Sequence, residues 1–188
     1  MCLESILYKI ASLEWFDLII DVNNVAYFRN KSKEKPSLED VLLLIDYAKN
    51  KFGVELSRIH CICDPSLRYY IDKPNEFQIL IEEGVIIEAP KLADEMILSF
   101  ALKYEFCFIV SNDKFRDYYN QLPSKEWLED RRISFMIIGD EVCLSPNIPY
   151  DRIKLLKKNK IVSRKQPKIS TLDVLHKIEQ TEGKFELF

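Results

Sequence analysis

The 188-residue sequence has only two histidines, and none of its five cysteines forms a Cys-x-x-Cys pair. Zinc sites are built mainly from cysteine and histidine, so this scarcity argues against a zinc ion. The first residues also lack a basic segment followed by a long apolar run, because Glu4, Lys9 and Glu14 interrupt them. We therefore expect neither a signal peptide nor a membrane span there. Scattered free thiols favour the reducing cytoplasm.

The chain has no excess of positive charge, since 27 lysines and arginines stand against 30 aspartates and glutamates. The whole chain is therefore not a basic nucleic-acid binder. The charge is uneven, however, because residues 151–170 hold eight basic side chains and one acidic side chain. An acidic body with a basic tail suggests carboxylates that bind a metal and cations that contact an anion. We expect one domain over residues 1–150, then a basic arm and a short helix over residues 151–188; the arm could equally lie against the acidic body.

Short apolar runs alternate with amphipathic segments along the body of the chain. Strands are expected at residues 16–21, 58–63, 85–88, 105–110 and 133–138, and helices at residues 1–14, 38–52, 75–83, 93–104 and 124–131. Ser37 is the expected N-cap of the second helix. The alternating order predicts an α/β fold in which helices cover both faces of a mostly parallel sheet of about five strands.

The first strand ends abruptly in an acid, Asp21. Ligands of parallel sheets bind beyond the carboxyl ends of the strands, and a buried charge is costly unless something binds it. Asp113 follows the fourth strand, and Asp94 opens the helix before that strand. We expect these three acids at one edge of the sheet. Each acid could instead be a separate helix cap or a solvated charge.

Two further acids are expected beside them. Asp117 shares a face with Asp113 if residues 113–117 are helical, and Glu95 follows Asp94. Several carboxylates at close range cannot all stay ionised without a counter-cation. Oxygen ligands without histidine or cysteine select Mg²⁺ or Mn²⁺. Such a site activates water and shields the charge that builds on a phosphoryl group.

Three segments resemble the PIN-like NYN ribonucleases, and the Regnase type in particular: Ile20-Asp21-x-x-Asn24-Val25, Ala93-Asp94-Glu95-x-Ile97 and Ile109-Val110-Ser111-Asn112-Asp113-x-Phe115-Arg116-Asp117. The similarity spans roughly residues 16–145 and implies a three-layer α/β/α fold. It also implies Mg²⁺-dependent endonucleolytic hydrolysis of RNA that leaves 5′-phosphate and 3′-hydroxyl ends. Val22 stands where the family commonly has glycine, and Glu95 replaces a usual aspartate. The zinc finger of the animal relatives is absent, so the domain, its tail or a partner must hold the RNA.

The resemblance implies a metal and catalytic centre at the matching positions, which are Asp21, Asn24, Asp94, Glu95, Asp113 and Asp117. We expect Asp21, Asp94 and Asp113 to bind or orient the metal, some through waters. Asp117 and Glu95 would support them or hold a second ion. Asn24 is neutral and can hold a water or a phosphate oxygen. The motifs contain no histidine, so water is the expected nucleophile rather than a 2′-hydroxyl group activated by histidine.

Basic residues flank the acids in the sequence. The expected RNA contacts are Arg29, Lys31, Arg68, Lys91, Lys114 and Arg116, each of which could equally be a solvated surface charge. Tyr69 and Tyr70 could stack on bases, but burial in the core is the favoured prediction for both. Two other functions stay open, namely a non-catalytic scaffold that binds RNA or protein and a nuclease for DNA or of the toxin type. The sequence also leaves open whether the chain works as a homodimer.

Overall fold

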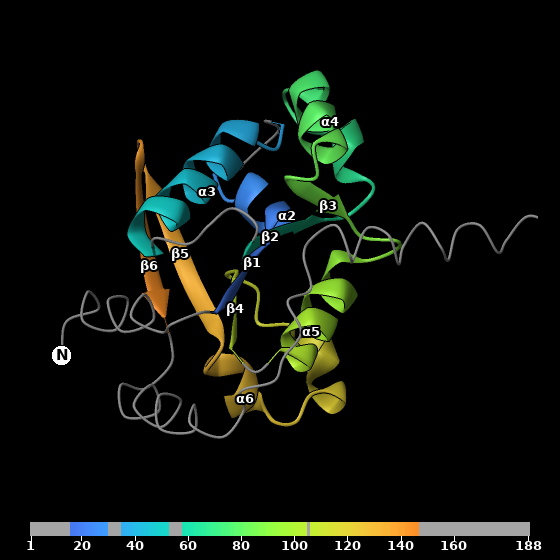
Figure 1. The fold of residues 1–188 in the computed structure, drawn as a ribbon, viewed down its shortest axis with the longest axis vertical. Coiled ribbons are helices and arrows are strands. Elements are labelled where there is room, and N and C mark those ends of the chain that lie inside the picture. Colours follow the sequence, from blue (N-terminus) through green and yellow to red (C-terminus); the bar gives the residue numbers. More distant parts are fainter. Residues whose placement is uncertain (1–15, 30–34, 53–57, 105, 147–188) are drawn as a thin grey trace, which may run out of the picture.

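The computed structural model describes residues 16–29, 35–52, 58–104 and 106–146. They form a six-stranded sheet between two layers of helices (Figure 1). The strands are β1 Asp17–Asp21, β2 Ile59–Cys63, β3 Ile86–Glu88, β4 Cys107–Val110, β5 Arg132–Ile138 and β6 Glu141–Pro146. They lie in the order β3-β2-β1-β4-β5-β6, and every pairing except β5 with β6 is parallel. The predicted α/β fold with a mostly parallel sheet is confirmed.

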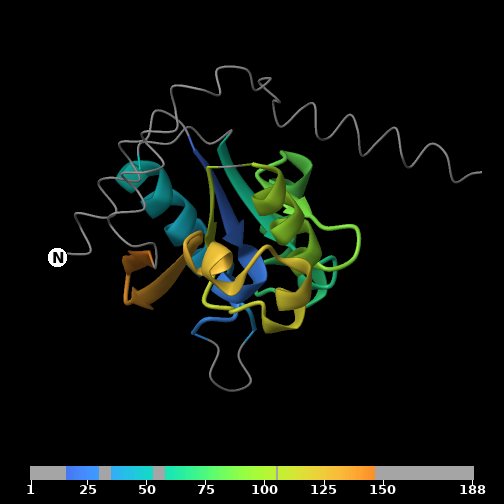
Figure 2. The same cartoon turned by 90° about the horizontal axis from the view of Figure 1, so that it is seen from below.

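The helices connect these strands. The α-helices are α2 Val22–Ala26, α3 Leu38–Phe52, α4 Pro74–Glu82, α5 Ala93–Lys103 and α6 Lys125–Glu129, and the 3₁₀ helices are η2 Leu67–Tyr69 and η3 Arg116–Gln121. Figure 2 shows α3 and α5 on opposite sides of β1. No helix of the described part of the chain is long and apolar enough to cross a membrane.

The alternation of side chains along β1 explains the two hydrophobic cores. Leu18 and Ile20 point into the core under α2, α3 and α4, whereas Ile19 points into the core under α5 and α6. All three side chains are fully buried, as expected for a central parallel strand. Cys61 on β2 also lies in the first core.

The helix starts follow ordinary capping rules. The hydroxyl of Ser37 accepts a hydrogen bond of 3.2 Å from the backbone N–H of Asp40, which confirms the predicted N-cap of α3. Ser124 caps α6 in the same way, with 3.0 Å to the N–H of Trp127. The predicted helices over residues 1–14 and in the tail, together with the basic arm, lie outside the described residues.

Two local predictions differ from the structure. Strand β6 was not expected, and it extends the sheet to six strands through a tight hairpin at Gly139. Residues 113–115 are not helical, because Phe115 adopts a left-handed conformation with φ 47° and η3 begins only at Arg116. The helical condition that would place Asp113 and Asp117 on one face is therefore not met.

Candidate active site

The carboxyl ends of β1, β2 and β4 meet at one edge of the sheet, because these neighbouring strands are parallel. Asp21 is the last residue of β1, and Asp113 lies just beyond β4. Asp94 lies in the first turn of α5. Asp21 and Asp94 each interact electrostatically with Asp113. The structure thus brings together the three acids that the sequence predicted at this edge.

Asp21 is nearly fully buried, with 3% of its surface exposed. One carboxylate oxygen accepts a 2.7 Å hydrogen bond from the hydroxyl of Ser111, and the other accepts a 3.1 Å bond from the N–H of Asn24. The second bond makes Asp21 the N-cap of α2. Burial raises the pKa of Asp21 to about 7, with smaller increases from Asp94 and Asp113, while the two hydrogen bonds lower it. Asp21 is therefore the helix cap that the sequence allowed, and its part in a metal centre stays a prediction.

Asn24 links two segments of the site that are far apart in sequence. Its Oδ1 accepts a 2.8 Å hydrogen bond from the backbone N–H of Asn112. The side chain of Asn112 in turn bonds both backbone polar groups of Phe135 on β5, at 3.0 and 3.1 Å. These two amide side chains therefore hold the segment after β1 in a fixed position relative to the loop after β4.

Asp64 is a further acid at this edge of the sheet, and it was not among the predicted site residues. It follows β2 directly, and its carboxylate accepts a 2.6 Å hydrogen bond from the N–H of Ala93, the first residue of α5. It also accepts a 3.0 Å bond from the side chain of Asn23, whose Oδ1 accepts a 2.8 Å bond from the N–H of Asp64. The signal was available, because Asp64 ends an apolar strand as Asp21 does.

Asp94 is half-buried, and its pKa is raised to about 6. Burial is the largest cause, followed by the negative charges of Asp113, Asp64 and Asp117. Glu95 is exposed on the same helical turn. Both Glu95 and Asp117 raise the pKa of Tyr118, after burial and Asp94. All the predicted acids therefore lie within electrostatic range of one another or of a common neighbour.

Asp113 is exposed and shapes its own loop. Its Oδ1 accepts a 2.8 Å hydrogen bond from the N–H of Phe115, and its backbone N–H donates a 3.0 Å bond to the hydroxyl of Ser111. Asp113 is thus held at the edge of the site by two local hydrogen bonds.

The donor set fits a hydrated hard cation. Within the described ranges, no three His, Cys, Asp or Glu side chains lie close enough to enclose a metal ion directly. Mg²⁺ commonly keeps several waters and contacts one or two carboxylates, so it needs no such enclosure. Burial, and then the negative charges of neighbouring acids, raise the pKa values of Asp21 and Asp94, and a cation at this edge would stabilise their charged forms.

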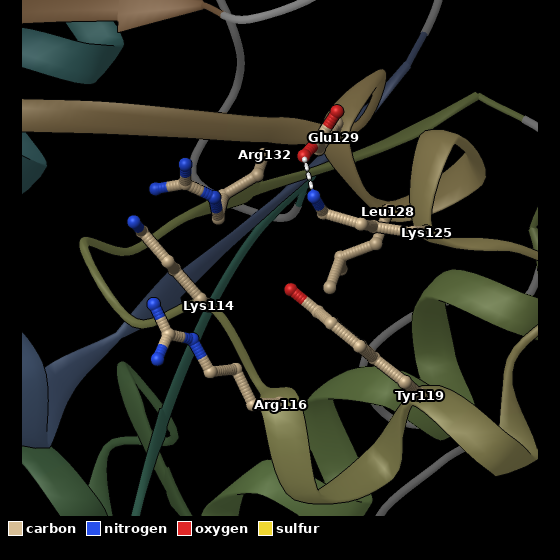
Figure 3. A pocket seen from close by; sticks show the side chains of 7 residues that line it. All are labelled: Lys114, Arg116, Tyr119, Lys125, Leu128, Glu129 and Arg132. Carbon is tan, nitrogen blue, oxygen red and sulfur yellow. Dashed lines mark ion pairs between the residues drawn. The ribbon is translucent and has the colours of Figure 1, made fainter.

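The predicted RNA contacts fall into different environments. Arg29 forms a bidentate pair with the buried Asp40, and Arg68 forms one with Glu88, so internal carboxylates already bind both guanidinium groups. Lys91 is exposed near the start of α5. Lys31 lies outside the described residues. Lys114 and Arg116 line a cavity beside the acids (Figure 3).

The favoured prediction that Tyr69 and Tyr70 are buried is wrong. The two residues are 78% and 58% exposed. The chain makes a 3₁₀ turn at this point, and Leu67 and Ile71 fill the core positions on either side of it. The tyrosine rings are therefore left on the surface.

The model of the family described as the Zc3h12a-like ribonuclease NYN domain matches residues 17–161. The chain belongs to this family. The match confirms the resemblance seen in the sequence motifs, and it establishes that the chain carries a ribonuclease domain of the NYN type.

Solved structures support the same fold. The NYN domain described here is similar to two structures of the nuclear protein-only RNase P 2 (PRORP2) of Arabidopsis thaliana. They share 18% and 17% sequence identity with it at TM-scores of 0.55 and 0.58, over 77% and 78% of this chain. The chain covers 33% of each of those structures, and at this identity the likeness concerns the fold. A search of curated proteins found no match.

Proposed function

We propose that this NYN domain is a Mg²⁺- or Mn²⁺-dependent endoribonuclease that hydrolyses phosphodiester bonds in single-stranded or looped RNA. The observation that carries the proposal is the cluster of Asp21, Asp94 and Asp113 at the carboxyl edge of the sheet. Two of these acids have pKa values raised toward neutrality. Perturbed carboxylates gathered at such an edge are typical of catalytic centres.

Asp21, Asp94 and Asp113 would hold the hydrated cation, some of them through its waters, with Asp64, Glu95 and Asp117 at the rim. When bound, the cation supplies an activated water and shields the charge that develops on the phosphoryl group. The remaining work belongs to the protein. Ser111 and the N–H of Asn24 fix both carboxylate oxygens of Asp21, and this preorganises the buried acid.

Asp94 and Asn24 have complementary roles in this proposal. Asp94 is half-buried in the first turn of α5 beside the other acids, so its carboxylate is placed to bind the cation or one of its waters. Because Oδ1 of Asn24 accepts from the N–H of Asn112, its Nδ2 is the atom available to donate to a phosphate oxygen. Asn24 thereby binds the substrate without adding negative charge.

Exposed tyrosines favour unpaired RNA as the substrate. Tyr69 and Tyr70 project from the turn after β2, and Tyr27 follows α2 with 43% of its surface exposed. The pKa of Tyr27 is raised by burial and then by Tyr70, so these two phenol groups interact electrostatically. Unstacked bases can pack on such rings, whereas bases inside a duplex cannot.

The test compares the wild-type protein with Asp113→Asn on a single-stranded RNA, its duplex form and a DNA of matched sequence. Each substrate is incubated with Mg²⁺ and with EDTA. We expect internal cleavage of the single-stranded RNA by the wild type in Mg²⁺ only. Cleavage of the DNA at an equal rate would overturn the RNA specificity. RNA binding without any cleavage would instead identify a non-catalytic scaffold.

A further inference from the structure

A cavity of about 530 Å³ lies beside the acidic centre, between the loop after β4, η3, α6 and the start of β5 (Figure 3). Its walls are formed by Lys114, Arg116, Tyr119, Lys125, Leu128, Glu129 and Arg132. Four of these seven side chains are cationic and one is anionic. Leu128 is buried and forms an apolar part of the cavity wall.

The cations of the cavity are not equally neutralised. Lys125 forms an ion pair with Glu129 at 3.4 Å. Arg132 donates to the carbonyl oxygen of Ser111 at 3.2 Å and to the hydroxyl of Ser134 at 2.8 Å, which leaves its positive charge uncompensated by these neutral partners. Figure 3 shows Lys114, Arg116 and Arg132 gathered on one side of the cavity, with the Tyr119 hydroxyl pointing into it.

The loop that carries Lys114 and Arg116 is held in an unusual conformation. Phe115 between them is the one non-glycine residue with positive φ in the described part of the chain, and its side chain is 2% exposed. Its N–H is bound by Asp113. Positive φ at a bulky residue is strained and persists only where the surroundings enforce it. The buried ring therefore anchors the loop and keeps its two cations at the cavity.

Ser111 connects the cavity to the acidic centre. Its hydroxyl donates to Asp21, and its carbonyl oxygen accepts from Arg132. Lys114 is also the residue that follows Asp113. The cavity therefore adjoins the acidic centre, and none of Asp21, Asp94 and Asp113 lines it, a position that suits a phosphate group other than the one cleaved.

We propose that this cavity is a phosphate-binding subsite that seats one phosphate of the RNA strand adjacent to the cleavage site. The inference rests on the proposed ribonuclease function. The guanidinium group of arginine can donate two parallel hydrogen bonds to the oxygens of one phosphate. The ammonium group of lysine adds a compact positive charge, and a tyrosine hydroxyl can donate a further hydrogen bond. The phosphate is either a 5′-terminal group, which has three non-bridging oxygens, or an internal phosphodiester, which has two, and the same cationic side chains can bind both anions.

Binding of fluorescent single-stranded RNA in EDTA tests the proposal without requiring cleavage. Three forms of one sequence are compared, with a 5′-phosphate, with a 5′-hydroxyl and as a closed circle. The variants are Arg116→Gln and Lys114→Gln, and the matched control is Lys103→Gln, an exposed lysine at the opposite end of α5. Equal melting temperatures establish that the variants are folded.

We expect each cavity variant to bind about tenfold more weakly, because a charge-assisted hydrogen bond to phosphate is lost. The slope of log affinity against log salt should become shallower by about 0.7 for each lost contact. The Lys103 control should match the wild type. If only the 5′-phosphorylated RNA loses affinity, the subsite holds a terminal phosphate; if all three forms lose it, the phosphate is internal.

Unchanged affinity and salt slope in both cavity variants would overturn the subsite, even for a protein that cleaves RNA. The opposite result is also possible. If the wild-type protein cleaves no RNA but the cavity variants still bind RNA more weakly than it does, the phosphate subsite is retained and the nuclease function is rejected. The two failures are therefore distinguishable.

Discussion

The hydroxyl of Ser111 donates a hydrogen bond of 2.7 Å to the buried carboxylate of Asp21, 90 positions away in the sequence. The same oxygen accepts the backbone N–H of Asp113 at 3.0 Å. One small side chain therefore joins the ends of β1 and β4 and fixes two of the proposed metal-binding acids relative to each other. It also lowers the pKa of Asp21 against the effect of burial.

Replacing Ser111 by alanine should shift the pH dependence of cleavage. The variant loses the bond that lowers the pKa of Asp21, so this pKa rises from its wild-type value of about 7, by about one unit for a hydrogen bond to a charged group. The acidic limb of the pH–rate profile in Mg²⁺ should move to higher pH by a similar amount. Ser111→Thr keeps the hydroxyl and serves as the control. An unchanged limb in Ser111→Ala would reject this role.

The metal-free protein should lose stability as pH rises. The pKa of Asp21 is raised from 3.8 to about 7 and that of Asp94 to about 6. At pH values between 3.8 and the native pKa values, the native state binds more protons than the unfolded state. The free energy of unfolding is therefore greatest at the low end of this pH range and falls as the pH rises through the native pKa values. In EDTA the melting temperature should be higher at pH 5 than at pH 8. Asp21→Asn should flatten this dependence, and an equally steep fall in that variant would contradict the assignment.

Asp113→Asn should separate catalysis from folding. The amide keeps the oxygen that accepts the N–H of Phe115, while one negative charge leaves the cluster. We expect loss of cleavage, retention of most RNA binding and a melting temperature in EDTA no lower than that of the wild type. The gain in melting temperature on adding Mn²⁺ should also be smaller, because a ligand stabilises by binding the native state. Unfolding in EDTA would identify Asp113 as a structural cap alone, and cleavage at the wild-type rate would show that the centre is misplaced.

Local patterns predicted the elements that carry the acids. The apolar run before Asp21 and the helical spacing of Ile97, Leu98 and Ala101 after Asp94 are local signals, and these side chains are buried as expected. Since parallel strands share a carboxyl edge, the meeting of Asp21 and Asp113 follows from topology.

Other features depend on pairings that a single sequence does not display. The partners of Arg29 and Arg68 become apparent only when separate elements pack together. The hairpin at Gly139-Asp140 did have a local signal, because a Gly-Asp pair between two apolar alternating runs is typical of a tight turn. The left-handed backbone at Phe115 had none, since a phenylalanine rarely adopts it.

Asp64 should act as a positioning residue for Asp94. Asp64→Ala removes the acceptor for the N–H of Ala93 and for Asn23, and this should cost about 1–2 kcal/mol of unfolding free energy as well as most of the cleavage rate. Asp64→Asn keeps an oxygen for Ala93 and should recover most of the stability. The Asn variant also removes a negative charge that raises the pKa of Asp94, so this pKa, followed by NMR, should fall. Equal stability of both variants and the wild type would reject the positioning role.

Arg29 allows the structural and RNA-binding interpretations to be separated. Its guanidinium binds Asp40, whose side chain is fully buried, and it also donates to the carbonyl oxygen of Gly139 at 2.9 Å. Arg29→Met leaves a buried carboxylate unpaired, so unfolding by urea should show a loss of about 3–5 kcal/mol. Adding Asp40→Asn to this variant should restore part of that loss, because the buried charge is then absent, whereas Lys103→Met should have little effect. If Arg29→Met instead keeps wild-type stability and weakens RNA binding in EDTA, Arg29 is an RNA contact and its pair with Asp40 contributes little to the fold.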